Sequence, residues 1–199
     1  MKVGILAIQG AISEHFSMIK KAFLELGTNG KILLVKNRED AKEINGLIIP
    51  GGESTTISRL MLKTGIYDTI LKRVENENLP IMGTCAGTIL LAKKIINQHE
   101  KNVKTLELMD MEIERNAFGR QRESFELDVP VKGFTRPFHA VFIRAPIIRK
   151  TWGNCRPLSN IDKNTIIAAQ QNNLIALTFH PELTEDTRIH KYFLKLIKE

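Results

Sequence analysis

The side chains best suited to nucleophilic chemistry in this sequence are a cysteine among small residues and a histidine followed by proline and glutamate. Cys85 lies in Gly83-Thr84-Cys85-Ala86-Gly87, between an apolar run (79–84) and a helical pattern. This order is typical of a nucleophile elbow, in which small neighbours permit a tight turn. The free N–H groups at the start of the helix favour a thiolate. A small core cysteine is the alternative, and the flanking glycines favour the nucleophile.

His180 is the best candidate for the base that such a thiol needs. It follows the apolar run 174–179 and precedes Pro181 and Glu182. Catalytic groups of open α/β sheets gather at the carboxyl ends of strands, where Cys85 is also expected. Pro181 favours an extended residue before it and should prevent a helix from starting there. We expect Glu182 to turn back and orient the His180 ring, although a strand-end His-Pro can also be a plain turn.

The other four histidines have weaker claims to a catalytic role. We expect His99 in a solvated loop, His190 exposed on the last helix, and His139 packed within a strand-like segment. His15 follows Glu14 on the first helix, where a surface role or a partner contact is expected.

A glycine pair follows another apolar strand, in Pro50-Gly51-Gly52-Glu53-Ser54. Its N–H groups, Gly52 foremost, can stabilise an oxyanion together with the amide of Ala86, the residue after the cysteine. Ser54 or Thr55 is expected to cap the next helix. A phosphate cradle is the alternative, but neither GxGxxG nor GxxxxGK[ST] is present. The three features together indicate acyl transfer and do not identify the acyl group.

Alternating strands and helices, followed by strands, must position these groups. We expect strands at 2–8, 31–36, 46–50 and 79–84, and helices at 12–26, Ala86 to Asn97 and from near Thr184, with two helices between Gly52 and Asn78 broken near Gly65. Period-2 patterns predict strands at 109–114 and 125–132 and a hairpin of 165–170 with 174–179. The prediction is one domain, residues 1–199, with a three-layer α/β/α fold and a mostly parallel, mixed central sheet.

Composition limits the function classes that remain. The chain has 199 residues, 43% hydrophobic and 26% charged, as is typical of globular proteins, and its apolar runs are too short to span a membrane. No signal peptide is recognisable, and two cysteines cannot form a disulfide framework, so the expected compartment is the cytoplasm. The net charge of +7 comes from scattered lysines and arginines, which indicates a solvated surface or a face for an acidic partner rather than nucleic-acid binding.

These motifs resemble those of triad-type, class I glutamine amidotransferases, and most closely those of the glutaminase subunits of pyridoxal 5′-phosphate synthases. The resemblance covers nearly the whole chain, through segments 9–15, 50–56, 83–87, 114–121, 142–146 and 179–184. The segments around Arg115 to Gln121 and Ile143 to Pro146 are the most specific to these subunits.

The resemblance implies a Cys85–His180–Glu182 triad that hydrolyses L-glutamine through a thioester, with no cofactor and no metal. It implies glutamine binding by the loop and by residues at two strand ends: Gly51, Gly52, Glu53, Arg115, Ile143 and Arg144. Ammonia would pass to a TIM-barrel synthase subunit, and Gln9, Glu14 and His15 would face it. The polar segment 97–104 and Cys155 receive no role.

Two other classes of protein remain as alternatives. Related cysteine hydrolases usually place a histidine directly after the elbow cysteine, where this chain has Ala86. A non-catalytic module of the same fold is expected to lack a triad residue, whereas Cys85, His180 and Glu182 are all present. A glutaminase that serves a different synthase is also possible.

Overall fold

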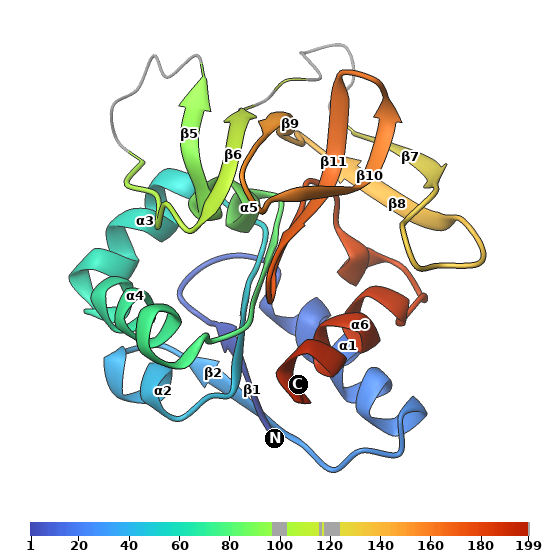
Figure 1. Ribbon diagram of the computed structural model, residues 1–199. Coiled ribbons are helices and arrows are strands. Elements are labelled where there is room, and N and C mark those ends of the chain that lie inside the picture. Colours follow the sequence, from blue (N-terminus) through green and yellow to red (C-terminus); the bar gives the residue numbers. More distant parts are fainter. Residues whose placement is uncertain (97–102, 116, 118–123, 199) are drawn as a thin grey trace.

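The computed structural model describes residues 1–96, 103–115, 117 and 124–198 (Figure 1). The helices are α1 (Ile12–Glu25), α2 (Arg38–Lys42), α3 (Ser54–Lys63), α4 (Ile66–Glu77), α5 (Ala86–Leu91) and α6 (Arg188–Lys198), with a 3₁₀ turn η1 (Pro181–Leu183). The strands are β1 (Lys2–Leu6), β2 (Lys31–Val35), β3 (Gly46–Ile49), β4 (Ile81–Thr84), β5 (Ala92–Ile96), β6 (Met109–Glu114), β7 (Ser124–Val129), β8 (Phe138–Ile143), β9 (Ile147–Thr151), β10 (Arg156–Asp162), β11 (Thr165–Gln171) and β12 (Leu174–Leu177).

One large sheet runs through the molecule in the order β2-β1-β3-β4-β12-β11-β9-β6-β5, and β10 pairs with β11. All pairings from β2 to β12 are parallel, whereas β11 is antiparallel to β12, β9 and β10. Strands β7 and β8 form a separate antiparallel pair. This arrangement confirms the predicted α/β fold with a mostly parallel, mixed sheet.

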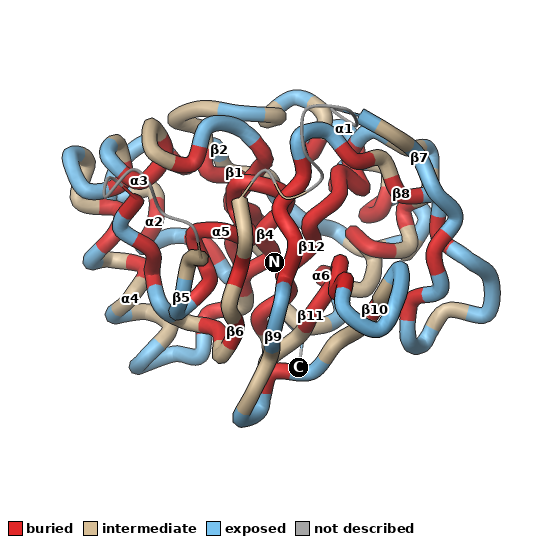
Figure 2. Tube along the Cα trace, turned by 90° about the horizontal axis from the view of Figure 1, so that it is seen from above, coloured by how far each residue is buried: buried red, intermediate tan, exposed pale blue. Residues whose placement is uncertain are grey.

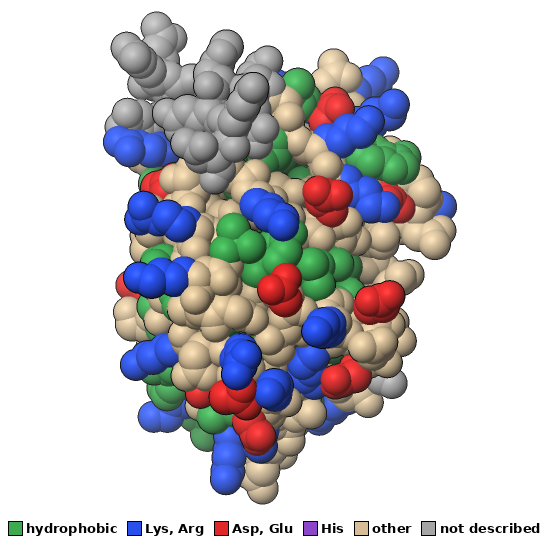
Figure 3. Space-filling model, turned by 90° about the vertical axis from the view of Figure 1, so that its left-hand side faces the viewer, with side chains coloured by type: hydrophobic (Ala, Val, Ile, Leu, Met, Phe, Trp, Pro, Cys, Tyr) green, Lys and Arg blue, Asp and Glu red, His purple; other side chains and the backbone are tan. Residues whose placement is uncertain are grey.

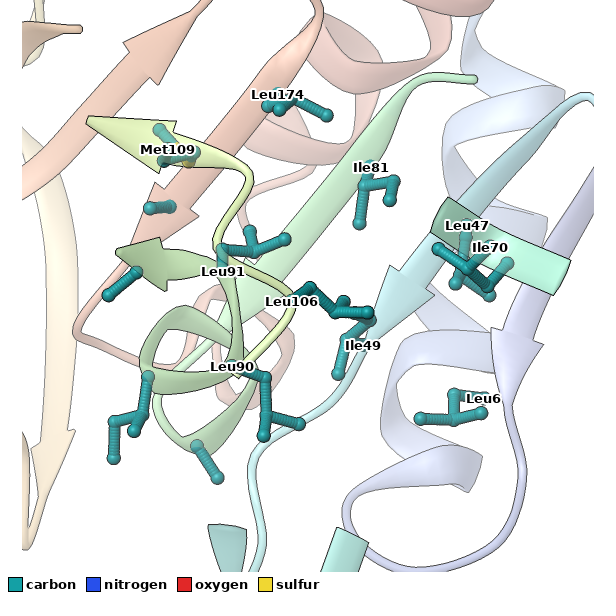
Figure 4. Packing of buried hydrophobic residues seen from close by; sticks show 14 of the residues in the cluster. Leu6, Leu47, Ile49, Ile70, Ile81, Leu90, Leu91, Leu106, Met109 and Leu174 are labelled. Atoms are coloured by element: carbon teal, nitrogen blue, oxygen red, sulfur yellow. The ribbon is translucent and has the colours of Figure 1, made fainter. Parts of the chain in front are cut away.

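Helices cover both faces of the sheet and enclose two hydrophobic cores (Figures 1 and 2). The period of two along β3 shows the division: Leu47 and Ile49 join the core under α2 to α5, and Ile48 joins the core under α1 and α6. Figure 4 shows the first core, to which Leu47 and Ile49 of β3 and Ile70 of α4 contribute. Because both faces are covered, the central strands β3, β4 and β12 are buried along their whole length and largely apolar, as the sequence indicates.

Most expected elements of the first half and the hairpin are confirmed. Gly65, with φ 71°, separates α3 from α4. Strands β11 and β12 pair in antiparallel fashion around a turn with Asn172 at φ 53°. The left-handed backbone at these two positions suits glycine and asparagine, which tolerate it better than other residues.

Several expectations about elements were wrong. The helix from Ala86 ends at Leu91, because residues 92–96 pair with β6 as β5. Residue Asn37 forms a capping box with Asp40 and starts α2, which was not predicted. Strands β9 and β10 were also missed. Helix α6 begins at Arg188, so Glu185 and Asp186 lie before it.

The surface supports the interpretation of the net charge. Figure 3 shows lysines and arginines interspersed with acidic and neutral side chains on the face that it displays, rather than gathered into one basic patch. Within the described part of the chain, no helix is both long and apolar enough to cross a membrane.

Candidate active site

Cys85 lies at the sharp turn between β4 and α5, with φ 48° and ψ −104°. A β-carbon at Gly83 would lie 2.6 Å from the carbonyl carbon of Gly87, and one at Gly87 would overlap the carbonyl oxygen of Ile49. Only glycine therefore permits this approach of strand and helix. The Cys85 N–H donates to the carbonyl of Leu177 at 2.8 Å, which ties the elbow to the end of β12.

His180 follows β12 and reaches the same edge of the sheet. Its backbone N–H donates to the carbonyl of Val141 at 2.8 Å, and η1 then turns the chain so that Glu182 faces the ring. His180 Nδ1 lies 2.7 Å from Glu182 Oε1, and both residues are buried. The expectation that Pro181 prevents a helix was wrong, because proline is tolerated at the first position of a helical turn, where its missing N–H is not needed.

The charges around His180 favour its imidazolium form. Burial lowers its pKa, but hydrogen bonds with Cys85 and Glu182 and the charges of both outweigh burial and raise the pKa to about 10. Burial raises the pKa of Glu182, and the neighbouring His15 and His180 outweigh it, so the pKa of this carboxyl is lowered. Because Nδ1 is engaged by Glu182, Nε2 is the nitrogen left for Cys85. The pair can therefore hold a thiolate beside a proton donor.

The glycine loop after β3 packs directly against these two side chains. A β-carbon at Gly51 would overlap His180 Cε1 and lie 3.3 Å from Cys85 Cβ. The Gly51 N–H donates to Thr84 Oγ1 at 3.0 Å. The amides of Gly52 and of Ala86, the first residue of α5, belong to the two turns that flank Cys85. N–H groups in the first turn of a helix have no partner within the helix, so Ala86 N–H can bind an oxyanion.

Glu53, and not Ser54 or Thr55 as expected, is the N-cap of α3. Its carboxylate accepts hydrogen bonds from the backbone N–H of Thr55 at 3.1 Å and of Thr56 at 2.7 Å. Burial raises the pKa of Glu53, but hydrogen bonds with the side chains of Thr55 and Thr56 and with their backbone N–H groups outweigh it and lower the pKa to about 2. The Glu53 N–H donates to Gln9 Oε1 at 2.8 Å, which fixes the start of the loop against residue 9.

One pocket of about 580 Å³ collects the candidate residues, a size common for small-molecule sites. Cys85, Ala86 and His180 line it together with every residue proposed for glutamine: Gly51, Gly52, Glu53, Arg115, Ile143 and Arg144. Arg115 Nη2 lies 3.9 Å from Glu53 Oε1. The Ile143 carbonyl oxygen is 3.8 Å from Cys85 Sγ. Arginines and an acidic cap around a thiol suit a substrate that carries both a carboxylate and an ammonium group.

The structure corrects three expectations about histidines. His15 is fully buried, so it does not present a surface to a partner, whereas Gln9 and Glu14 line the pocket. His190 is also fully buried rather than exposed. His139 is exposed rather than packed, and it contacts Asp128 and Glu126.

The helical period contained a signal for both buried histidines. His15 lies four residues before Ile19 and His190 lies three before Phe193, so each shares the buried face of its helix. The expected face of α1 included Phe16, which is 39% exposed.

Some expectations concern residues outside the described ones, namely His99, Asn116, 118–121 and most of 97–104. Cys155 is buried away from the pocket, and burial, with Asp110 nearby, raises its thiol pKa to about 11. In the ranges that the structure describes, no group of three or more His, Cys, Asp or Glu side chains is arranged to hold a metal ion.

The chain is similar to known proteins over nearly its whole length. Residues 5–199 match the model of the SNO glutamine amidotransferase family. The pyridoxal 5′-phosphate synthase subunit PdxT of Staphylothermus marinus is 50% identical over 100% of both chains, and that of Pyrococcus furiosus is 48% identical over 99% of both. A crystal structure described as a glutamine amidotransferase superposes with a TM-score of 0.86, at 44% identity and 99% coverage of each chain.

Proposed function

The chain belongs to the SNO glutamine amidotransferase family, and from this premise we propose that it is the glutaminase subunit of a pyridoxal 5′-phosphate synthase. It hydrolyses L-glutamine to L-glutamate and ammonia and works with a synthase subunit that uses the ammonia. The observation that carries the proposal is that Cys85 and His180 line one pocket, with Glu182 in contact with His180, in a chain with full-length relatives named for that synthase.

In the first half of the proposed reaction, Cys85 Sγ attacks the side-chain amide carbon of glutamine. The amide oxygen becomes negative and accepts hydrogen bonds from the N–H groups of Gly52 and Ala86. The C–N bond then breaks, and His180 gives its proton to the leaving nitrogen, which departs as ammonia. The raised pKa of His180 means that it begins the cycle with this proton. The product is a thioester between Cys85 and the glutamyl group.

In the second half, water attacks the thioester carbonyl. His180 accepts a proton from the water, the C–S bond breaks, and glutamate leaves. Glu182 holds His180 through Nδ1 at 2.7 Å and stabilises the imidazolium in both halves. Arg115 and Arg144 line the pocket wall, where a guanidinium can hold the α-carboxylate of glutamine in a forked contact.

Ammonia released into neutral water would be mostly protonated and thus a poor nucleophile, so direct transfer to a partner is chemically favourable. We propose that the partner is a TIM-barrel synthase subunit and that Gln9 and Glu14, which line the pocket, lie near it. A thiol nucleophile has to stay reduced, which fits the cytoplasm as the compartment.

The first experiment measures glutamate released from glutamine by the purified chain, with and without a pyridoxal-phosphate synthase subunit. Hydrolysis that appears or rises sharply with the synthase supports both the chemistry and the complex. Hydrolysis that is independent of the synthase keeps the glutaminase and points to a different partner. No hydrolysis in either mixture contradicts the proposal and favours a non-catalytic module.

A further inference from the structure

Two buried histidines lie directly behind the triad, on the side away from the pocket. His15 of α1 and His190 of α6 have no exposed surface, and His15 Nδ1 is 3.1 Å from His190 Nε2. His15 Nε2 points toward the triad, at 3.4 Å from Glu182 Oε2 and 3.1 Å from Thr84 Oγ1. The proposed chemistry so far uses neither histidine.

The second oxygen of Glu182 needs an explanation. Oε1 is engaged by His180, but Oε2 is buried and has no hydrogen-bond partner among the residues that the structure describes. Burying a carboxylate oxygen without a donor is costly, so a donor within reach of it matters. His15 Nε2, which is equally buried, lies 3.4 Å from this oxygen.

The contacts select one tautomer of His15. If Nε2 carries the hydrogen, it faces the Glu182 carboxylate and Thr84 Oγ1, while Nδ1 accepts a hydrogen bond from His190 Nε2–H. The opposite tautomer would turn a lone pair toward the carboxylate and leave a buried N–H at His190 Nδ1, which has no partner in the described part of the chain. Burial lowers the pKa of His15 and of His190, which favours the neutral form of both rings.

Thr84 extends the contact to the glycine loop. Its Oγ1 accepts the Gly51 N–H at 3.0 Å as well as facing His15 Nε2 at 3.1 Å. The Nε2 of His15 therefore lies between Glu182, the acid of the triad, and Thr84, which binds the glycine loop. This position links His15 to both parts of the site.

We propose that His15 is a positioning residue, which holds Glu182 through its Nε2–H and is itself held in that tautomer by His190. The proposal rests on the glutaminase function, because Glu182 matters through His180. It predicts that His15 acts on the chemical step and leaves glutamine binding nearly unchanged.

The test uses two substitutions that separate the two ring nitrogens. The amide of glutamine reaches the place of Nε2, whereas that of asparagine reaches only the place of Nδ1. In the full chain with its synthase subunit, we expect His15→Asn to lower kcat about tenfold or more, the scale seen when groups behind a functional side chain are removed. KM for glutamine should change less than about twofold. His15→Gln should recover most of the kcat.

A double-mutant cycle separates positioning from general damage. In a Glu182→Gln background, His15→Asn should lower kcat by less than about twofold, because the group through which it acts is already altered. Ser58→Ala is the matched control: it removes the hydrogen bonds of another buried side chain, which donates to the Lys104 carbonyl at 2.8 Å and accepts from the Lys104 N–H at 3.0 Å, and should leave kcat unchanged.

A second readout does not depend on glutamine. The rate at which iodoacetamide alkylates Cys85, followed by peptide mass, reports how well His180 supports the thiolate. His15→Asn should slow this rate several-fold, and His15→Gln should restore it. If these changes occur in a chain that hydrolyses no glutamine, the proposed function is wrong and the positioning role stands. The positioning role is overturned if His15→Asn and His15→Gln have the same kcat and the same alkylation rate. It is also overturned if His15→Asn lowers kcat by the same factor with Glu182 present and in the Glu182→Gln background.

Discussion

The molecule contains a cysteine and a histidine–carboxylate contact in each of two regions. At the carboxyl ends of β4 and β12, Cys85 and His180 share a pocket, and His180 Nδ1 lies 2.7 Å from Glu182. In the antiparallel part, Cys155 lies just before β10, and His139 on β8 has its Nδ1 2.8 Å from Asp128. The two histidine contacts have nearly the same length.

The difference between the regions lies in burial and convergence. The His180 pair is buried, beside a thiol and Gly51, so its charges interact in a medium of low polarity. The side chain of His139 is 50% exposed, and its carboxylate contacts are weakened by water. Cys155 is packed among core residues rather than beside either histidine. A histidine–carboxylate distance therefore does not identify a catalytic histidine. Its burial and the thiol beside it do.

The largest effect on activity should come from replacing Cys85, whereas replacing Cys155 should have none. Cys85→Ala should lower glutamate release by a factor on the order of 10⁴ or more, because no other group forms the thioester. The fold should persist, since a small residue replaces a small one at the elbow. Cys155→Ala should leave kcat unchanged and lower only stability. Assays of glutamate release and urea unfolding on both variants check this, and normal turnover in Cys85→Ala would contradict the assignment.

The next largest effect should come from replacing His180, with His139 as the matched residue in the other region. His180→Asn should lower kcat nearly as much as loss of the cysteine, by a factor on the order of 10³, because both proton transfers pass through this ring. His139→Asn changes an exposed ring outside the pocket and should leave kcat within twofold. Steady-state kinetics of the two variants measure the difference, and similar losses in both would erase the distinction between the regions.

A methyl group added to a glycine tests the packing around His180. Gly51→Ala places a carbon against His180 Cε1, so we expect the ring to shift and kcat to fall by a factor on the order of 10². Gly133→Ala, between β7 and β8, meets no atom within 4 Å but has φ +86°. It should cost about 1 kcal/mol of unfolding free energy and no activity. Equal activities in the two variants would show that the loop does not constrain the ring.

Removing only the charge of the triad acid should be milder. Glu182→Gln keeps a group that can orient His180 and loses the support for the imidazolium, so kcat should fall by about 10- to 100-fold. Asp128→Asn makes the same change beside the exposed His139 and should be silent in the glutaminase assay. A loss in Glu182→Gln as large as that in His180→Asn would mean that the carboxylate does more than hold the ring.

The last comparison concerns the stability of the fold and its dependence on pH. The folded-state pKa of His180 is about 10, above its ordinary value of 6.5, so its contribution to stability is full below pH 6.5 and is lost as the pH rises through 10. The free energy of unfolding in urea should fall over this window, and His180→Asn should flatten that fall. The pKa of His139 is also raised, through Asp128 and then Glu126, but the group is exposed, so His139→Asn should leave the curve unchanged.

Features that depend on neighbouring residues in the chain could be predicted from the sequence. The pairing of strands that are distant in the chain could not. The elbow glycines around Cys85 and the apolar strand before His180 are local, and they predicted a shared sheet edge correctly. The extent of α5 was predicted wrongly because residues 92–96 become a strand only by pairing with β6. Burial of His15 escaped notice because Phe16, one residue away, was assigned to the buried face.

The insertion of β12 between β4 and β11 has a consequence for the order in which the protein is made. The elbow leaves the ribosome early, but the strand that pairs beside it and the histidine that follows that strand come near the end of the chain. The Cys85 N–H finds its acceptor, Leu177, only when this late segment is inserted. A nascent or truncated chain that lacks residues 174–182 thus carries the thiol without its base, so glutamine is hydrolysed only by a molecule that has finished folding.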